Sequence, residues 1–320
     1  MIQKASGSKQ PGYVDASRSG FMTPEVIAFF QDHGYLVLEN ALNAAEVRAL
    51  NEDAMQICRG KYGTYDGWSG PHDGQTDDEV LRQYLCIHFP HKFSPVMKQH
   101  LAHPAMVEAL VGMIGPDVKC MQSMLFIKAA GKPGQAWHQD EDYIPTRDRS
   151  LTGGWIALDD ATVQNGCLWV IPGSHRPGVL WPQSLQDDPR FDCGEESQGF
   201  PYTEADAVPV EVKAGSIVYF NGYLLHRSLP NQAETGYRRV LVNHYMSASS
   251  LLPWVANLQE HDCYLDHTRS VAKCDVRDIV MVAGQDPYAW MGVSDLNKPH
   301  VRPTGEGGCA KAAEPGKASR

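Results

Sequence analysis

The chain has 320 residues, of which 42% are hydrophobic and 21% charged, the proportions of a soluble globular protein. Its formal net charge of −10 argues against nucleic acid or an anionic membrane surface as a main partner. No apolar run reaches the about 18 residues that a transmembrane helix needs, and residues 1–20 lack the apolar stretch of a secretory signal. The eight cysteines contain no Cys-x-x-Cys spacing, which excludes zinc-ribbon and thioredoxin-type sites, and we expect an intracellular protein with reduced thiols, with the cytoplasm as the default compartment.

The first third of the chain predicts helices and one short strand. Residues 1–20 are polar and rich in Gly and Ser, and we expect a flexible N-terminus there. Thr23, followed by a proline, is a helix-start signal, and a strand is expected after that helix, around Tyr35–Leu38. Apolar residues at helical spacing predict two more helices, over 43–60 and 104–116.

Short apolar or alternating runs follow from residue 118 onward, separated by Gly, Pro, Asn and Asp. These runs predict strands, and they read VKCMQSMLFIKAA, GGWIALDD, CLWVIPG, VPVEVKAGSIVYF and RRVLVNHYM. Many short strands punctuated in this way favour an antiparallel sandwich or barrel, and the Asn-Gly pair in QNGC (164–167) predicts a tight turn. We expect one domain over residues 21–300 and a disordered tail over 301–320, where large apolar residues are few.

The segment GQAWHQDEDYIP (134–145) contains the first candidate for metal chemistry. In a strand, residues i and i+2 point to the same side, so His138 and Asp140 can aim an imidazole and a carboxylate at one ion. The spacing by itself also fits a polar strand end, and Glu141 and Asp142 offer further carboxylates. Strand alternation favours Asp140 over Glu141.

A third metal ligand is expected from the second half of the chain. Two histidines and one carboxylate suit non-haem Fe(II), because they leave coordination positions open. His226, just past the apolar run that ends at Phe220, is the best candidate, while His244 in VLVNHYM reads more readily as a core histidine with a satisfied hydrogen bond. Arg238 and Arg239 open the last strand run, and an inward arginine needs a buried acidic partner; the alternative is an exposed charge on an edge strand.

Four segments together resemble the phytanoyl-CoA dioxygenase family of Fe(II)- and 2-oxoglutarate-dependent oxygenases. They are WHQDEDY, GWIALDDATVQNGCLWVIPGSHRPG, HRS and GYRR. The resemblance runs from about Gln122 to Met246, and more loosely back to Phe21. It implies a mainly β fold with flanking helices, namely a double-stranded β-helix, which is a jelly-roll barrel like that of the cupins.

The resemblance also implies roles for individual residues. Fe(II) would be bound by the catalytic set His138, Asp140 and His226. Arg238 would pair with the far carboxylate of 2-oxoglutarate, and the other contacts to this cosubstrate would come from Ser228, Trp155 and Met124. A lysine that the family places early in the chain is not located in this sequence: the stretch CIHFPHK lies near the expected place, but it has His88 and no lysine at the natural position.

The implied reaction uses O2 and 2-oxoglutarate, releases succinate and CO2, and hydroxylates a C–H bond of a small-molecule substrate. Related halogenases have Ala or Gly at the carboxylate position, so Asp140 makes halogenation unexpected. The alternatives are desaturation, epimerisation or cyclisation by the same iron-centred oxidation, or a catalytically silent jelly-roll binding protein. Candidate substrate contacts are Asp142, Tyr143 and His88, and the long aromatic loop over 61–80 is a candidate lid. The sequence carries no signal for an oligomeric state.

Overall fold

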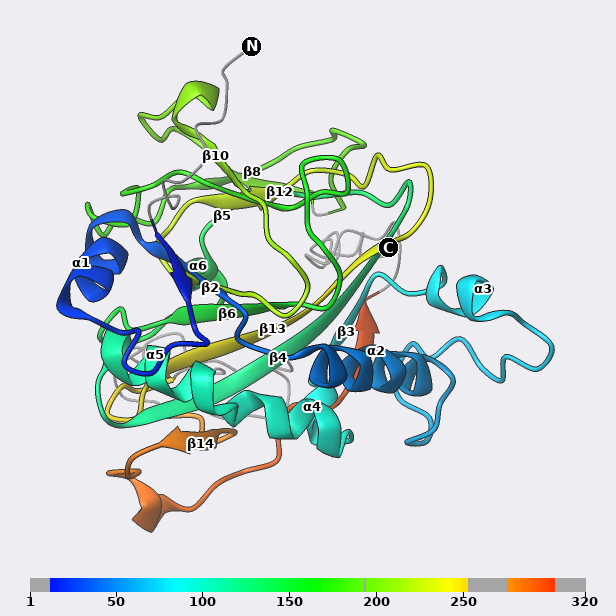
Figure 1. The fold of residues 1–320 in the computed structure, drawn as a ribbon, viewed down its shortest axis with the longest axis horizontal. Coiled ribbons are helices and arrows are strands. Elements are labelled where there is room, and N and C mark those ends of the chain that lie inside the picture. Colours follow the sequence, from blue (N-terminus) through cyan, green and yellow to red (C-terminus); the bar gives the residue numbers. More distant parts are fainter. Residues whose placement is uncertain (1–11, 193, 253–274, 303–320) are drawn as a thin grey trace, which may run out of the picture.

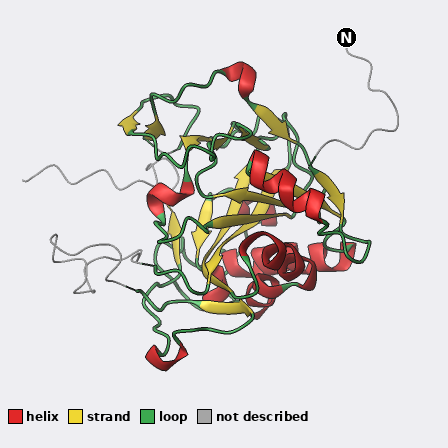
Figure 2. Ribbon diagram, turned by 90° about the vertical axis from the view of Figure 1, so that its left-hand side faces the viewer, coloured by secondary structure: helices red, strands yellow, loops and turns green. Residues whose placement is uncertain are grey.

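The structure is a computed structural model that describes residues 12–192, 194–252 and 275–302. Two β-sheets face each other, and most of the helices cover the outer face of the larger sheet (Figures 1 and 2). The large sheet has the strand order β1-β2-β11-β6-β13-β4-β3-β15, with β14 also paired to β4, and the small sheet has the order β10-β7-β12-β5. This is the predicted double-stranded β-helix with flanking helices.

The strands of the large sheet, in chain order, are β1 (Tyr13–Asp15), β2 (Tyr35–Glu39), β3 (Cys86–His88), β4 (Val118–Ala129), β6 (Thr152–Ala157), β11 (Ile217–Asn221), β13 (Tyr237–Ser247), β14 (Val280–Ala283) and β15 (His300–Arg302). Those of the small sheet are β5 (Gln135–His138), β7 (Leu168–Val170), β10 (Val208–Val210) and β12 (His226–Ser228), and β8 (Gln183–Leu185) pairs with β9 (Glu195–Ser197). All of these pairings are antiparallel except that of β1 with β2.

The helices are α1 (Pro24–His33), α2 (Ala44–Cys58), α3 (Asp77–Leu81), α4 (Pro95–Gln99), α5 (Pro104–Ile114) and α6 (Asp140–Tyr143), with short 3-10 turns at Pro90–Lys92, His100–Ala102, Glu204–Asp206 and Ala289–Met291. The predicted start of α1 is confirmed, because the Thr23 hydroxyl accepts a hydrogen bond from the Val26 amide. Helix α2 begins with a reciprocal capping box between Asn43 and Glu46. In the part of the chain that the structure describes, no helix is long and apolar enough to cross a bilayer.

Two hydrophobic cores hold the layers together. One lies between α2, α5 and the large sheet and buries Leu50, Leu110 and Tyr245. The other lies between the two sheets and buries Trp155, Val170 and the aliphatic residues around them. Side chains alternate between these cores along each central strand, as the two-residue period of a strand requires.

Both expected flexible ends contribute strand residues, which corrects part of the sequence interpretation. Tyr13–Asp15 pairs with β2, and Val301 and Arg302 lie in β15, which pairs with β3. Long-range pairing orders these short segments, although their composition is that of a loose tail. The rest of the expected tails, 1–11 and 303–320, lies outside the described residues, and the domain limits of 21–300 stay a prediction.

Candidate active site

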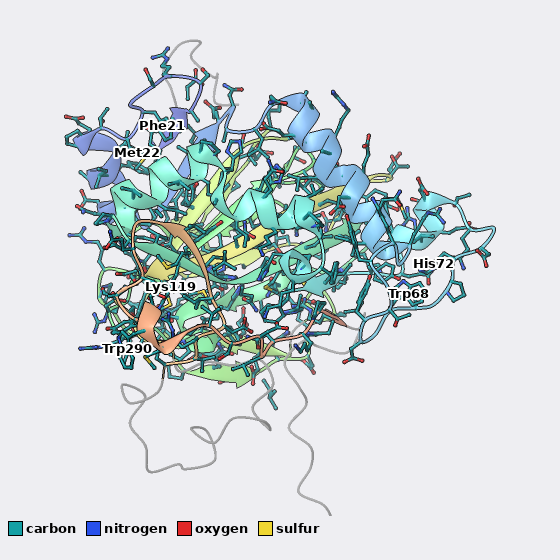
Figure 3. All side chains as sticks on the ribbon, turned by 90° about the horizontal axis from the view of Figure 1, so that it is seen from below. Phe21, Met22, Trp68, His72, Lys119 and Trp290 are labelled. Carbon is teal, nitrogen blue, oxygen red and sulfur yellow. The ribbon has the colours of Figure 1, made fainter. Side chains whose placement is uncertain are left out.

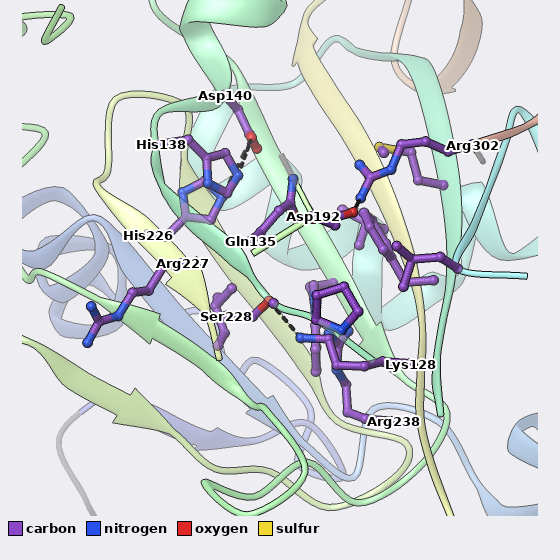
Figure 4. Close-up of a pocket in the computed structure, with 18 of the residues that line it drawn as sticks. Lys128, Gln135, His138, Asp140, Asp192, His226, Arg227, Ser228, Arg238 and Arg302 are labelled. Carbon is purple, nitrogen blue, oxygen red and sulfur yellow. Dashed lines mark hydrogen bonds and ion pairs between the residues drawn. The ribbon is translucent and has the colours of Figure 1, made fainter. Parts of the chain in front are cut away.

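A pocket lies between the two sheets (Figure 4). Both sheets contribute to its wall, together with the loops that follow β4 and β8. Its polar lining includes three histidines, two aspartates and the cations of β4, β13 and β15. These residues are His138, Asp140, His226, His244, Asp192, Lys128, Arg238 and Arg302.

His138, Asp140 and His226 meet at one end of this pocket. His138 ends β5 and His226 begins β12, and the two residues lie opposite each other in the paired strands. The Nε2 atoms of His138 and His226 lie 3.7 Å and 3.5 Å from Oδ1 of Asp140. One ligand atom from each residue falls within 4.8 Å of the others, and all three residues are buried.

Asp140 is not part of a strand, so strand alternation does not explain its position. Strand β5 stops at His138, and Asp140 is the first residue of the short helix α6. Glu141 is buried on the other side, where its carboxylate accepts hydrogen bonds from the amide and hydroxyl of Thr146 at 2.5 Å. The choice of Asp140 over Glu141 therefore agrees with the geometry, but its stated reason was wrong.

Backbone contacts fix His138 and His226 in the tautomer that leaves Nε2 free to bind a metal. Nδ1 of His138 lies 2.8 Å from the carbonyl oxygen of Ala136, and Nδ1 of His226 lies 2.9 Å from that of Leu224. Because a carbonyl only accepts, each Nδ1 carries the proton and each Nε2 presents a lone pair to the pocket. Burial, reinforced by His226, lowers the pKa of His138 to about 3, so its imidazole is neutral.

His244 lies against the back of Asp140 and does not complete the ligand set. Its Nε2 is 3.0 Å from Oδ2 of Asp140, the oxygen that faces away from the two other histidines. Burial alone would raise the pKa of Asp140, but the facing His226 and His244 outweigh it and lower that pKa. The interpretation of His244 as a core histidine with a satisfied hydrogen bond agrees with this contact, although its partner is the candidate ligand itself.

The two adjacent arginines of β13 have opposite surroundings. Arg238 is 3% exposed and lines the pocket, its guanidinium lies 5.5 Å from the centre of the Trp155 ring, and its Nε has no hydrogen-bond partner among the described residues. Arg239 points to the other face, where it forms two hydrogen bonds of 2.8 Å and 2.7 Å with Asp159. Arg238 is therefore the one that can receive an acidic ligand.

Lys128 is a second cation at the Arg238 end of the pocket, and sequence reasoning missed it. Its buried ammonium donates to the Ser228 hydroxyl at 2.9 Å and to the Leu229 carbonyl at 2.7 Å (Figure 4). Burial and the charge of Arg238 hold its pKa well below the ordinary value. A signal was present, because Met124 and Lys128 are four residues apart on β4 and a strand places both on one face.

The other predicted cosubstrate contacts also line the pocket. Met124 and Trp155 form part of its wall beside Arg238, and Ser228 lies two residues past His226 on β12. The structure thus brings all the residues predicted for iron and 2-oxoglutarate into one cavity.

The predicted substrate contacts are not brought into the pocket wall. Asp142 is exposed in α6, because the strand expected to continue there ends earlier. Tyr143 donates to Gln183 at 2.9 Å, with its ring 6.2 Å from that of His138. His88 stacks on His300 at 4.5 Å. None of the three is among the residues that line the cavity, so their contact with substrate stays a prediction.

The loop over 61–80 folds back onto α2 and does not cover the pocket. The Trp68 indole donates to the Cys58 carbonyl at 2.9 Å, and His72 lies 2.9 Å from the Tyr84 hydroxyl. Figure 3 shows Trp68 and His72 at the edge of the molecule.

Comparisons with known proteins agree with this geometry. A family model described as Phytanoyl-CoA dioxygenase (PhyH) matches residues 30–240. Phytanoyl-CoA dioxygenase 1 of Oryza sativa subsp. japonica is 34% identical over 245 residues, which cover 67% of this chain and 85% of the rice protein.

Solved structures share the fold at lower identity. The non-heme monooxygenase ThoJ matches with a TM-score of 0.60 and 24% identity, over 81% of this chain and 84% of ThoJ. The non-heme alpha ketoglutarate dependent epimerase SnoN matches with a TM-score of 0.54 and 18% identity, over 71% of this chain and 83% of SnoN. These likenesses show the fold, while the family match covers most of the chain and includes the buried His-Asp-His set. The chain therefore belongs to the phytanoyl-CoA dioxygenase family and is an Fe(II)- and 2-oxoglutarate-dependent dioxygenase.

Proposed function

We propose that this enzyme hydroxylates a C–H bond of a small molecule, with iron held by His138, Asp140 and His226. The observation that supports this most directly is the convergence of their free ligand atoms within 4.8 Å at the end of a buried pocket. Two neutral imidazoles and one carboxylate are the donor set of non-haem Fe(II) oxygenases, and they leave positions open for other ligands. His244 would orient Asp140 from behind, since it holds the second carboxylate oxygen.

The opposite end of the pocket fits a dicarboxylate cosubstrate. The Arg238 guanidinium and the Lys128 amino group are both buried there, and among the described residues neither forms an ion pair. Leaving such charges without an acidic partner is costly, so an anionic ligand is favoured there. We infer that the far carboxylate of 2-oxoglutarate pairs with Arg238 and Lys128, that Ser228 adds a hydroxyl contact, and that Trp155 and Met124 form the wall.

The bound iron and cosubstrate supply the oxidising chemistry, and the chain supplies ligands, orientation and a dry cavity. The apolar part of the lining includes Phe220, Val242 and Leu168, and apolar side chains at this place would limit the access of water once a substrate is bound. The neutral state of His138 keeps its Nε2 lone pair available for the metal throughout the neutral pH range. These features favour an active enzyme over a silent jelly-roll binding protein, because such a protein has no need of a complete donor set.

The test is a measurement of succinate release and oxygen consumption by the purified protein with Fe(II) and 2-oxoglutarate. The proposal predicts slow turnover without substrate and faster turnover when a substrate from a metabolite library binds. A product heavier by one oxygen atom supports hydroxylation, while a product lighter by two hydrogens replaces it with desaturation. If the protein binds no iron and forms no succinate, the silent binding protein is the correct interpretation.

A further inference from the structure

A buried ion pair lies in the pocket wall apart from the metal ligands and from the cations assigned to the cosubstrate. It joins Arg302, at the end of β15, to Asp192, in the segment between β8 and β9. Each residue is 8% exposed, and both line the cavity. Figure 4 shows the His-Asp-His set, the Lys128–Arg238 group and the Arg302–Asp192 pair at three separate places round the cavity.

The ion pair uses only part of its hydrogen-bonding capacity. One terminal nitrogen of Arg302 donates to Oδ2 of Asp192. Nε of Arg302 and Oδ1 of Asp192 are both buried without a hydrogen-bond partner among the described residues. Buried polar atoms in native proteins are nearly always satisfied. An unpaired donor and an unpaired acceptor on the two members of one ion pair, in the wall of a catalytic cavity, are therefore available to a ligand that offers the complementary groups.

The pair shares the cavity with the candidate metal ligands. Arg302 and Asp192 line the same pocket as His138 and Asp140, at a separate place in its wall (Figure 4). The ring of Phe126 lies 5.5 Å from the guanidinium carbon and provides an apolar surface beside the pair. A ligand head bound to Arg302 and Asp192 would place the rest of a small molecule between the pair and the His-Asp-His set.

The ion pair has one positive and one negative member, and this limits the classes of ligand that can bind to it. A simple anion would have to displace Asp192 from Arg302 and leave a buried carboxylate without a partner, which is strongly unfavourable. A ligand that carries both charges avoids this, because its carboxylate pairs with Arg302 and its ammonium pairs with Asp192. We propose that Arg302 and Asp192 bind the head group of the primary substrate, and that this head is the zwitterion of an α-amino acid. The inference rests on the proposed function, since it assigns a substrate class to the same pocket.

A purely structural role is the competing explanation, because the pair also joins β15 to the segment before β9. Such a role would change stability without changing which molecules stimulate turnover. The Arg239–Asp159 pair offers a control, since it is also an arginine–aspartate pair, partly buried, but neither residue lines the pocket. Asp159→Asn removes the same charge as Asp192→Asn.

The experiment measures succinate release by the full-length protein with Fe(II) and 2-oxoglutarate, in the presence of each common L-amino acid, its N-acetyl derivative or its methyl ester. The shift in melting temperature that each compound causes is recorded as a readout of binding. We expect at least one free amino acid to stimulate succinate release and to raise the melting temperature. Its N-acetyl derivative and its methyl ester should each be weaker by about 30-fold or more, because each lacks one buried charge contact.

Asp192→Asn should shift the preference ratio between the free amino acid and its N-acetyl derivative by about 30-fold toward the derivative. Asp159→Asn should keep the wild-type ratio. If Asp192→Asn does not fold, Arg302→Gln replaces it, and the ratio between the free amino acid and its methyl ester should shift toward the ester.

An unchanged ratio in a folded Asp192→Asn protein, with only the melting temperature lowered, would overturn the inference in favour of the structural role. Wild-type protein that forms succinate but responds to no free amino acid would overturn it as well, while leaving the proposed function intact. Protein that forms no succinate under any condition would contradict the proposed function itself and the substrate class with it.

Discussion

Replacing Arg238 by methionine should separate ligand binding from stability. Arg238 is 3% exposed, and burial lowers its pKa to about 10. Among the described residues no carboxylate pairs with it, so in the ligand-free protein its charge is poorly compensated. Replacing a poorly compensated buried charge with an apolar side chain of similar length is often neutral or stabilising. We therefore expect Arg238→Met to leave the free energy of unfolding unchanged or to raise it.

The same substitution should weaken 2-oxoglutarate binding strongly. Loss of one partner of a buried charge pair costs about 2–5 kcal/mol, which corresponds to about 30-fold to several thousand-fold in affinity. Lys128 stays in place with its ammonium 2.9 Å from the Ser228 hydroxyl and can still attract the same carboxylate. We therefore expect the KM for 2-oxoglutarate to rise toward the lower end of that range, by about 30- to 100-fold.

The assay is the initial rate of succinate release against 2-oxoglutarate concentration, together with urea unfolding of the ligand-free protein. Arg239→Met is the matched control, because it breaks the two hydrogen bonds to Asp159 on the other face of β13. It should lower the free energy of unfolding by about 1 kcal/mol and leave the KM unchanged. An unchanged KM in Arg238→Met, or a raised KM in the Arg239 variant alone, would refute the assignment.

Three further predictions concern other buried groups. Lys128→Met should raise the KM for 2-oxoglutarate by about tenfold, and Lys128→Arg should recover part of the loss; equal KM values in all three proteins would count against the second cation. His244→Gln should weaken Fe(II) binding by about 10- to 100-fold, measured by titrating apo protein with Fe(II) under anaerobic conditions, and an unaltered affinity would limit His244 to packing. Burial, reinforced by the charge of Lys92, lowers the pKa of His91 from 6.5 to about 4. Between pH 6.5 and about pH 4 the unfolded chain therefore binds a proton at His91 that the folded chain does not bind. As the pH is lowered through this range, the free energy of unfolding should decrease by about 2–3 kcal/mol. Urea unfolding at neutral pH and near pH 4.5 should show this loss in wild type and a smaller one in His91→Gln, and equal losses would show that other groups titrate instead.

The elements that local chemistry specifies were predicted well from the sequence. The start of α1 follows from Thr23 and the proline after it, and the central strands follow from their apolar or alternating runs. The three residues predicted as ligands do converge in the structure, but the local geometry of Asp140 differs from the predicted strand. A helical turn begins directly after Gln139, where the Glu141 amide donates to the Gly222 carbonyl at 3.0 Å. That contact depends on a segment distant in sequence, which periodicity does not specify.

Three other polar residues of the pocket wall, Lys128, Arg302 and Asp192, were not predicted from the sequence. Lys128 followed the same two-residue period as Met124, so its position on the inner face was predictable in principle. Arg302 and Asp192 gave no such signal, because Arg302 is placed by pairing of β15 with β3 and Asp192 by a loop. Arg302, a residue of the pocket wall, was therefore missed because it lies in the tail that was expected to be disordered.

The most direct test of the central claim is the iron content of the purified protein, measured together with succinate release, in wild type, Asp140→Ala and Asp142→Asn. The Asp140 carboxylate lies in the proposed ligand set, whereas Asp142, two residues along the same short helix, is exposed. It predicts one Fe(II) per chain and succinate formation in wild type and in Asp142→Asn, and loss of both in Asp140→Ala. Full iron content and undiminished succinate release in Asp140→Ala would contradict it.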